Sequence, residues 1–111
     1  MEIKDNAKIR KEFSSKASNS FVKCKKKLEV EAIKGNAEQN IYIGKKSLWH
    51  SLKIFIFGIE LCETNEIHLE NKILEEYYND IITNEYTWEE LKEKYQPIYN
   101  SLHSKFKLVC N

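Results

Sequence analysis

Residues that break helices are scarce in this chain. Its 111 residues include three glycines and one proline. An all-β domain needs turn residues at roughly every 8–12 positions, so this scarcity disfavours strands joined by tight turns. The length suits one domain of ordinary size. We therefore expect an all-α fold, a compact bundle of four or five helices in a single domain spanning residues 1–111.

Helical spacing of apolar side chains indicates where the helices lie. Residues 4–33 are predicted to form a basic helix, although the serine-rich patch at 14–20 leaves open a break into two shorter helices. Residues 35–44 are expected to be a connector, with residues 41–43 as a short extended anchor. The predicted apolar stripe of the first helix is Ile9, Phe13, Ala17, Phe21, Cys24 and Leu28.

The rest of the chain carries three more helical patterns. Residues 45–63 are apolar on most sides, which predicts a central buried helix ended by Thr64-Asn65. Residues 69–83 and 87–109 are predicted to be acidic, amphipathic helices, and Thr87 and Glu90 match the capping box that starts a helix. The predicted stripes are Leu69, Ile73, Leu74, Tyr77, Tyr78, Ile81 and Ile82, then Trp88, Leu91, Tyr95, Ile98, Leu102, Phe106 and Val109.

Charge is distributed unevenly along the chain. Residues 1–53 carry thirteen Lys or Arg against six Asp or Glu, whereas residues 54–111 carry five against eleven. The two halves could attract each other, or the basic half could face a phosphate-bearing ligand. The run Lys23, Lys25, Lys26 and Lys27 is a candidate nucleic-acid contact, although such a run on a helix is more often simply solvated.

Cysteine usage suggests reduced thiols. Cys24, Cys62 and Cys110 are odd in number and far apart, which is typical of a reducing compartment. The pairs Cys62 with His68 and His103 with Cys110 lack the four ligands of a structural zinc site, so no metal site is predicted. The beginning of the chain has no apolar signal sequence, and no run approaches the roughly 20 residues that cross a bilayer. We expect a cytoplasmic or nuclear protein with no membrane contact.

Three basic side chains form the main candidate site. Lys46, His50 and Lys53 stand at i, i+4 and i+7, so they share one face of the predicted helix 45–63. Near the amino-terminal end of a helix, lysines and unpaired amides together favour an anion. The set is a candidate site for nucleotide or phosphate, and the competing interpretation is a solvated face on which His50 merely bonds a neighbour.

The same region carries a family resemblance. Residues 44–53 read GKKSLWHSLK and continue as FGIEL at 57–61 and ETNEI at 63–67, flanked by FSSKASNSF at 13–21 and NEYTWEEL at 84–91. Together these stretches resemble the helical region that follows the catalytic core in predicted nucleotidyltransferases of the polymerase-β-like superfamily. The resemblance covers about residues 10–107. In that family a helix carries Lys, then His, then a basic residue at the spacing of Lys46, His50 and Lys53.

The resemblance also shows what this chain lacks. Members of the family transfer nucleotides in an upstream α/β core, where a Gly-Ser turn cradles the triphosphate and paired carboxylates bind Mg²⁺. This chain has no Gly-Ser, and its two aspartates, Asp5 and Asp80, stand far apart. The resemblance thus implies a helical binding half that has no catalytic residues and binds no cofactor alone. Mg²⁺ and a nucleoside triphosphate would be bound only with a catalytic core, whether the chain is a truncated product, a fragment or a split partner.

Two other functions remain open at this stage. A helical protein–protein interaction module would use the acidic carboxy-terminal helices, and it predicts an exposed apolar patch. A stand-alone nucleic-acid-binding domain would use the basic amino-terminal helix. The partners that follow from these hypotheses are a nucleotidyltransferase core or split partner chain, another protein, or a nucleic acid.

Overall fold

The chain folds into an all-α bundle. The structure is a computed structural model that describes residues 6–31, 34–66 and 71–110. Its helices are α1 (Asn6–Lys26), α2 (Ala37–Thr64), α3 (Lys72–Thr83) and α4 (Trp88–Val109), and a π-helical turn, η1 (Lys27–Glu31), extends α1. The described residues contain no strand. None of these helices is long and apolar enough to cross a bilayer.

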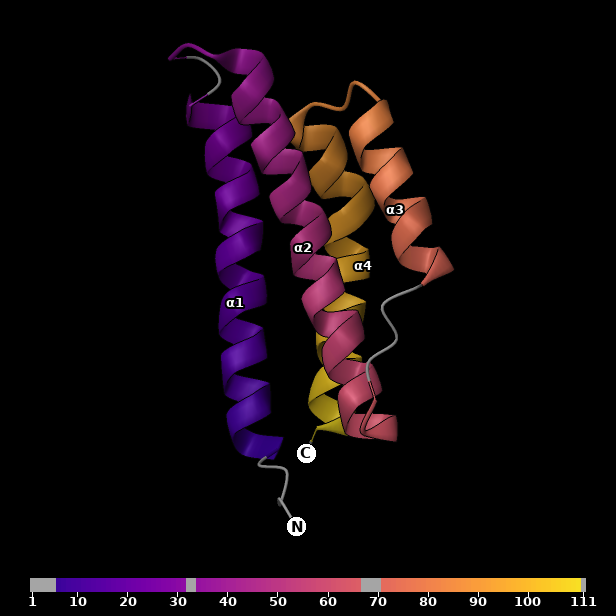
Figure 1. Cartoon of the computed structure of the whole chain (residues 1–111). Helices are drawn as coiled ribbons and strands as arrows, with labels where there is room; N and C mark the ends of the chain where they lie inside the picture. The colour runs from indigo at the N-terminus through magenta and orange to yellow at the C-terminus, as the bar shows by residue number, and fades with distance from the viewer. Residues whose placement is uncertain (1–5, 32–33, 67–70, 111) are drawn as a thin grey trace.

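Helix α2 lies at the centre of the bundle. It contacts α1, α3 and α4, and successive helices run in alternating directions, so that the amino and carboxyl ends of the chain lie at the same end of the molecule (Figure 1). This position agrees with the prediction of a central helix that is apolar on most sides. The bundle is elongated, with extents of 51 × 25 × 23 Å.

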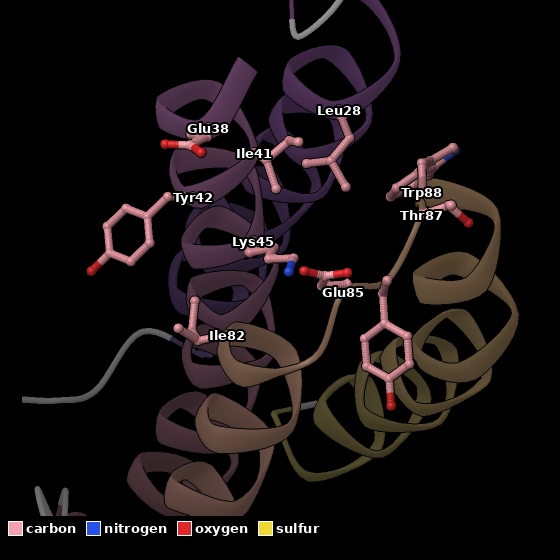
Figure 2. A pocket seen from close by; sticks show the side chains of 10 residues that line it. Leu28, Glu38, Ile41, Tyr42, Lys45, Ile82, Glu85, Thr87 and Trp88 are labelled. Carbon is pink, nitrogen blue, oxygen red and sulfur yellow. The ribbon is translucent and has the colours of Figure 1, made fainter. Parts of the chain in front are cut away.

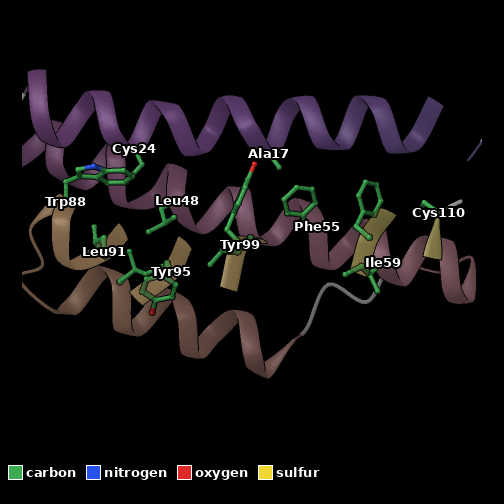
Figure 3. Close-up of a cluster of buried hydrophobic side chains, with 13 residues drawn as sticks. Ala17, Cys24, Leu48, Phe55, Ile59, Trp88, Leu91, Tyr95, Tyr99 and Cys110 are labelled. Carbon is green, nitrogen blue, oxygen red and sulfur yellow. The ribbon is translucent and has the colours of Figure 1, made fainter. Parts of the chain in front are cut away.

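The core follows the predicted stripes closely. In Figure 3 the buried side chains of α2 and α4 point toward each other beneath α1. Aromatic rings connect the layers, since the Phe21 ring of α1 lies 4.6 Å from that of Tyr99 and 5.6 Å from that of Trp88. Tyr99 is buried although it was not in the predicted stripe. The buried cluster comprises Ala17, Cys24, Leu48, Leu52, Phe55, Ile59, Ile81, Trp88, Leu91, Tyr95, Tyr99, Phe106 and Cys110.

Helix α1 continues through the serine-rich patch without the break that the sequence left open. The predicted start of the second helix is wrong, because α2 begins at Ala37 and most of the expected connector 35–44 is helical. Asn36, which precedes α2, adopts a left-handed conformation and its side chain caps no amide. The start of α2 therefore lacks the usual capping signal, and the β-branched pair around Tyr42 suggested extended chain instead.

The ends of the later helices agree better with their sequence signals. Asn65 ends α2 in a left-handed conformation and donates its N–H to the Leu61 carbonyl. The capping box of Thr87 and Glu90 is formed as predicted. Helix α3 starts after Asn71, whose side chain accepts bonds from two amides, and the predicted start at Leu69 lies outside the described residues.

Ile73, a member of the third predicted stripe, is exposed. Ile73 is 52% exposed, whereas its neighbour Leu74 is 4% exposed. Both residues lie in the first turn of α3, and only one side of this turn faces α2. Leu74 occupies that side, and it also supplies the carbonyl that accepts a bond from the Trp49 indole at 2.9 Å.

Gly44 allows α1 and α2 to pack closely. A Cβ built at this position would lie 2.9 Å from the Lys27 Cβ and 3.3 Å from the Cys24 carbonyl oxygen, and it would also overlap the Leu28 side chain. Backbone and β-carbon atoms cannot move aside without shifting the helix. A residue with a side chain at position 44 would thus push the carboxyl end of α1 away from α2.

Asp80 connects α3 to α4. Its carboxylate accepts hydrogen bonds from the hydroxyls of Tyr95 and Tyr86, and its oxygen lies 2.9 Å from the Lys94 ammonium. Burial alone raises the pKa of Asp80, but the bonds from Tyr95, Lys94 and Tyr86 favour the charged form more strongly. The net effect is a pKa below the ordinary value. This cluster holds α3 in position, because the hydroxyl of the buried Tyr95 would otherwise be unsatisfied.

The cysteine prediction is wrong for two of the three residues. Cys62 and Cys110 form a disulfide, with Cα atoms 5.5 Å apart. The antiparallel arrangement of α2 and α4 brings together positions separated by 48 residues, which spacing along the sequence does not reveal. Cys24 is the remaining free thiol of the described residues. Burial raises its pKa to about 12, so it is a packing residue.

We predict that Gly44→Ala lowers the free energy of unfolding by up to about 2 kcal/mol. Overpacking costs about 1–3 kcal/mol, and the better helix propensity of alanine offsets about 1 kcal/mol of it. Urea denaturation monitored by circular dichroism measures the change. Ser101→Ala, on the exposed face of α4, is the control and should remain within about 0.5 kcal/mol of the parent chain. A Gly44→Ala chain more stable than the parent would contradict the close contact.

Asp80 should contribute to stability in a pH-dependent way. Because its folded-state pKa lies below 3.8, its contribution is present above that value and is lost as pH falls through the folded pKa. Asp80→Asn should cost about 1–3 kcal/mol at pH 6, and the difference from the parent should shrink toward pH 2. Denaturation at several pH values measures it, with Glu93→Gln as an exposed control. A difference that does not change with pH would argue against the Asp80 cluster.

Candidate phosphate-binding face

Lys46, His50 and Lys53 lie on α2, but not near its amino-terminal end. Because α2 begins at Ala37, Lys46 is in its third turn, where backbone amides are already bonded within the helix. The expected help from unpaired amides and from the helix dipole is therefore wrong for this site. Any attraction for an anion must come from the side chains.

A fourth basic residue joins the three from another helix. The pKa of His50 is lowered first by partial burial, and then by the positive charges of Lys53, Lys46 and Lys23. Lys23 is on α1, so the site spans the contact between α1 and α2. We call Lys23, Lys46, His50 and Lys53 the basic face. The low pKa keeps the imidazole neutral at pH 7, where it offers one N–H donor.

Aromatic rings hold two of the lysines in place. The Lys53 ammonium lies 4.8 Å from the centre of the Trp49 ring and 5.8 Å from that of Phe57, and the Lys46 ammonium lies 5.9 Å from the centre of the Tyr42 ring. Such cation–π contacts are each worth about 0.5–1 kcal/mol at exposed sites. They orient the ammonium groups without neutralising their charge.

No carboxylate compensates the basic face in the described part of the chain. The ion pairs of Lys94 with Asp80 and of Lys105 with Glu63 lie elsewhere and involve no lysine of the basic face. A cluster of like charges without counter-ions attracts phosphate groups, and it would do so more weakly at high salt. The arrangement can thus bind an anion. The hydroxyls of the nearby serines are bonded to the backbone, since Ser47 donates to the Ile43 carbonyl and Ser51 to the Leu48 carbonyl.

The lysine run of α1 is only partly brought to this face. Lys23, Lys25 and Lys26 are exposed at the end of α1, whereas Lys27 begins the π-helical turn η1 and is half-buried. Of the four, Lys23 alone acts on the charge of His50. The nucleic-acid contact at these four residues stays a prediction, and it shares Lys23 with the basic face.

The described residues offer no metal site. No three His, Cys, Asp or Glu side chains of that part of the chain come close enough to share an ion. Cys62 and Cys110 are joined to each other, and His103 stacks on Phe55 with ring centres 4.8 Å apart. His68 lies outside the described residues.

Lys45 is the functional candidate that the sequence analysis missed. It is 7% exposed, and its ammonium donates a hydrogen bond to the Asn84 carbonyl at 2.6 Å. Burial lowers its pKa, although the neighbouring Glu85 carboxylate acts in the opposite direction. The sequence pattern predicts that the helix starts at Lys45, and a lysine in the first turn of a helix is expected to be exposed. Lys45 follows the apolar Ile41 by four residues, so both side chains lie on the same face of the helix. This spacing is the signal that could have indicated the burial of Lys45.

A cavity of about 570 Å³ lies beside Lys45. Figure 2 shows the Lys45 ammonium and the Glu85 carboxylate pointing toward each other, with the Leu28 and Ile41 side chains on one side and Trp88 on the other. The cavity is bounded by the end of α1, the first turns of α2 and the turn between α3 and α4. Its lining comprises Leu28, Glu38, Ile41, Tyr42, Lys45, Ile82, Glu85, Tyr86, Thr87 and Trp88.

The exposed large apolar side chains of the described residues come from several elements of the bundle. The exposed large apolar residues of the described chain lie on five different elements, and isolated residues of this kind are ordinary on protein surfaces. They are Val22, Val30, Tyr42, Ile73 and Leu108. The surface therefore adds no specific support for the interaction-module hypothesis.

Comparison with known proteins finds no relative for this chain. No family model matches it, and no curated protein or solved structure is significantly similar to it.

We predict that His50 titrates below 6.5, its ordinary value. Lys46→Gln plus Lys53→Gln should raise this pKa, because two of the nearby charges that disfavour the imidazolium are removed. Lys11→Gln plus Lys16→Gln, on the distant half of α1, should leave it unchanged. NMR titration of the histidine ring protons, assigned with His50→Gln, measures all three chains. An unchanged His50 pKa in the first double variant would show that the lysines do not act on it.

Proposed function

We propose that this chain is the helical binding half of a nucleotidyltransferase-like protein, and that its basic face binds the phosphates of a nucleotide. The proposal depends on one observation above all. Lys46, His50 and Lys53 share one face of α2, and the charge of Lys23 on α1 also acts on His50. The ion pairs of Lys94 and Lys105 lie elsewhere among the described residues. The resemblance of residues 44–67 to the helical region of nucleotidyltransferases supports the same ligand.

Nucleotide transfer by the chain alone is not part of the proposal. Two-metal phosphoryl transfer needs carboxylates that hold the ions, and Asp80 is occupied by Tyr95, Tyr86 and Lys94. We propose that the catalytic core, with Mg²⁺ and its carboxylates, is supplied by a partner chain or a further domain. The bundle would then form the basic wall of a shared nucleotide site.

A cytoplasmic or nuclear location belongs to this proposal as well. Nucleotide chemistry is expected there, and no helix of the described residues could cross a membrane. The Cys62–Cys110 disulfide is an argument against it, because structural disulfides are rare in reducing compartments. Counting alkylated thiols in protein isolated from cells under acid-quenched conditions would decide between the two.

We predict that replacing two lysines of the basic face weakens nucleotide binding. Charge-assisted hydrogen bonds contribute about 1.5–3 kcal/mol each when fully formed, so Lys46→Ala plus Lys53→Ala should lower the affinity for a Mg²⁺-bound nucleoside triphosphate by about tenfold or more. Isothermal titration calorimetry at low salt gives the dissociation constants.

The matched control removes the same charge elsewhere. Lys11→Ala plus Lys16→Ala should reduce the affinity by less than about threefold, because only long-range attraction is lost. Equal losses in the two double variants would mean that net charge, and not the basic face, attracts the ligand. If the parent chain bound no nucleoside triphosphate, either alone or together with a candidate catalytic core, the proposed function would be wrong.

A further inference from the structure

The cavity beside Lys45 has the features of a small-molecule site. Ligand sites are typically about 300–1,000 Å³, mostly apolar, and contain a few polar groups that converge. This one has a volume of about 570 Å³ and apolar walls formed by Leu28, Ile41, Ile82 and Trp88. Its polar groups are a lysine that is more than nine-tenths buried and a glutamate facing it (Figure 2).

The Lys45 ammonium keeps donors available for a ligand. It has three N–H groups, and the structure assigns one of them to the Asn84 carbonyl. The Glu85 carboxylate accepts hydrogen bonds and can accept two from one planar partner. The ammonium donors and the carboxylate acceptors thus lie next to each other, and apolar side chains flank them (Figure 2).

We propose that this cavity binds a guanine base. The O6 atom of guanine is an acceptor, and its N1–H and N2–H₂ groups are donors on the same edge. The Lys45 ammonium donates to O6, and the Glu85 carboxylate accepts from N1–H and N2–H₂. The ring lies against the side chains of Trp88 and Ile41. Adenine carries an N6–H₂ donor where guanine has O6, so it would face Lys45 with the wrong group.

Charge in the cavity argues against a free anion as its ligand. Lys45 is accompanied by Glu85, which acts on its charge, and by Glu38 at the lining. Two carboxylates and one ammonium repel a carboxylate or phosphate. A neutral base with both donors and acceptors is satisfied by the same groups.

Tyr42 belongs to the lining of the cavity and also contacts a lysine of the basic face. This lysine is Lys46, whose ammonium lies over the Tyr42 ring. A nucleotide whose base occupies the cavity can direct its phosphates along α2 toward Lys46 and His50. The inference thus rests on the proposed function and adds to it the identity of the base.

Calorimetry with four ligands tests the inference. The parent chain should bind Mg²⁺-bound GTP about tenfold or more tightly than ATP, since one good bidentate contact discriminates by about 1–3 kcal/mol. ITP, which keeps O6 and N1–H but lacks the N2 amino group, should fall between them. Guanosine, which has no phosphate, should still bind at millimolar concentration, and this binding should not depend on Lys46 or Lys53.

Two variants locate the preference. Glu85→Gln should reduce the GTP preference to about threefold or less while ATP affinity is unchanged, and Glu85 is exposed enough for the variant to fold. Glu93→Gln, an exposed residue of α4 outside the cavity, should keep the full preference. Lys45→Met should also lose the GTP preference. Because this variant lacks the hydrogen bond to the Asn84 carbonyl, its free energy of unfolding is measured as well.

The outcomes separate the two proposals. GTP and ATP that bind equally well, and that both depend on Lys46 and Lys53, would overturn the guanine assignment and leave the basic face intact. A guanosine complex whose affinity is unaffected by the basic-face variants, with no gain from phosphates, would support the cavity and overturn the phosphate site. A GTP preference that survives Glu85→Gln would place guanine recognition elsewhere and overturn this inference.

Discussion

The close contact of α1 with α2 is the constraint on which the rest of the structure depends. At Gly44 the backbone of one helix meets side-chain and backbone atoms of the other, with no room for a Cβ. This approach brings Lys23 toward His50, and it sets Leu28 against the first turns of α2, where the cavity begins. The basic face and the cavity are therefore both products of a single helix pairing. A wider separation would disperse the charges and open the cavity to solvent.

Much of this fold could be predicted from the sequence because helical periodicity and capping residues are local signals. The stripes of α1 and α4, the central position of α2, and the capping box at Thr87 all depend on residues within a few turns of each other. The start of α2 could not be found in this way, since Asn36 supplies no capping side chain. Ile73 was misjudged for a related reason, because which of two adjacent apolar residues is buried depends on the direction of approach of α2.

Some residues of the candidate site could also be predicted from local spacing, whereas others are brought in by packing between helices. Spacing alone grouped Lys46, His50 and Lys53, and their shared face needs only one helix. Lys23 of α1 lies near His50, and Glu85 of the α3–α4 turn lies near Lys45. No local sequence pattern connects either residue to α2. Lys45 was hidden by its neighbour, since two consecutive lysines look alike in sequence but project about 100° apart on a helix. One is exposed at the basic face, and the other is buried between helices. The packing of α2 against the other helices determines which of the two lysines is buried.

The disulfide places a covalent link at one end of the bundle only. Cys62 and Cys110 join α2 to α4 close to the carboxyl end of each helix, whereas the cavity lies near the opposite end of both. Helix α4 has 22 residues and is about 33 Å long. The covalent link therefore restrains the end of the helix pair that lies away from the cavity. At the cavity end the same two helices are held by noncovalent packing, in which Leu48, Trp88 and Leu91 are buried.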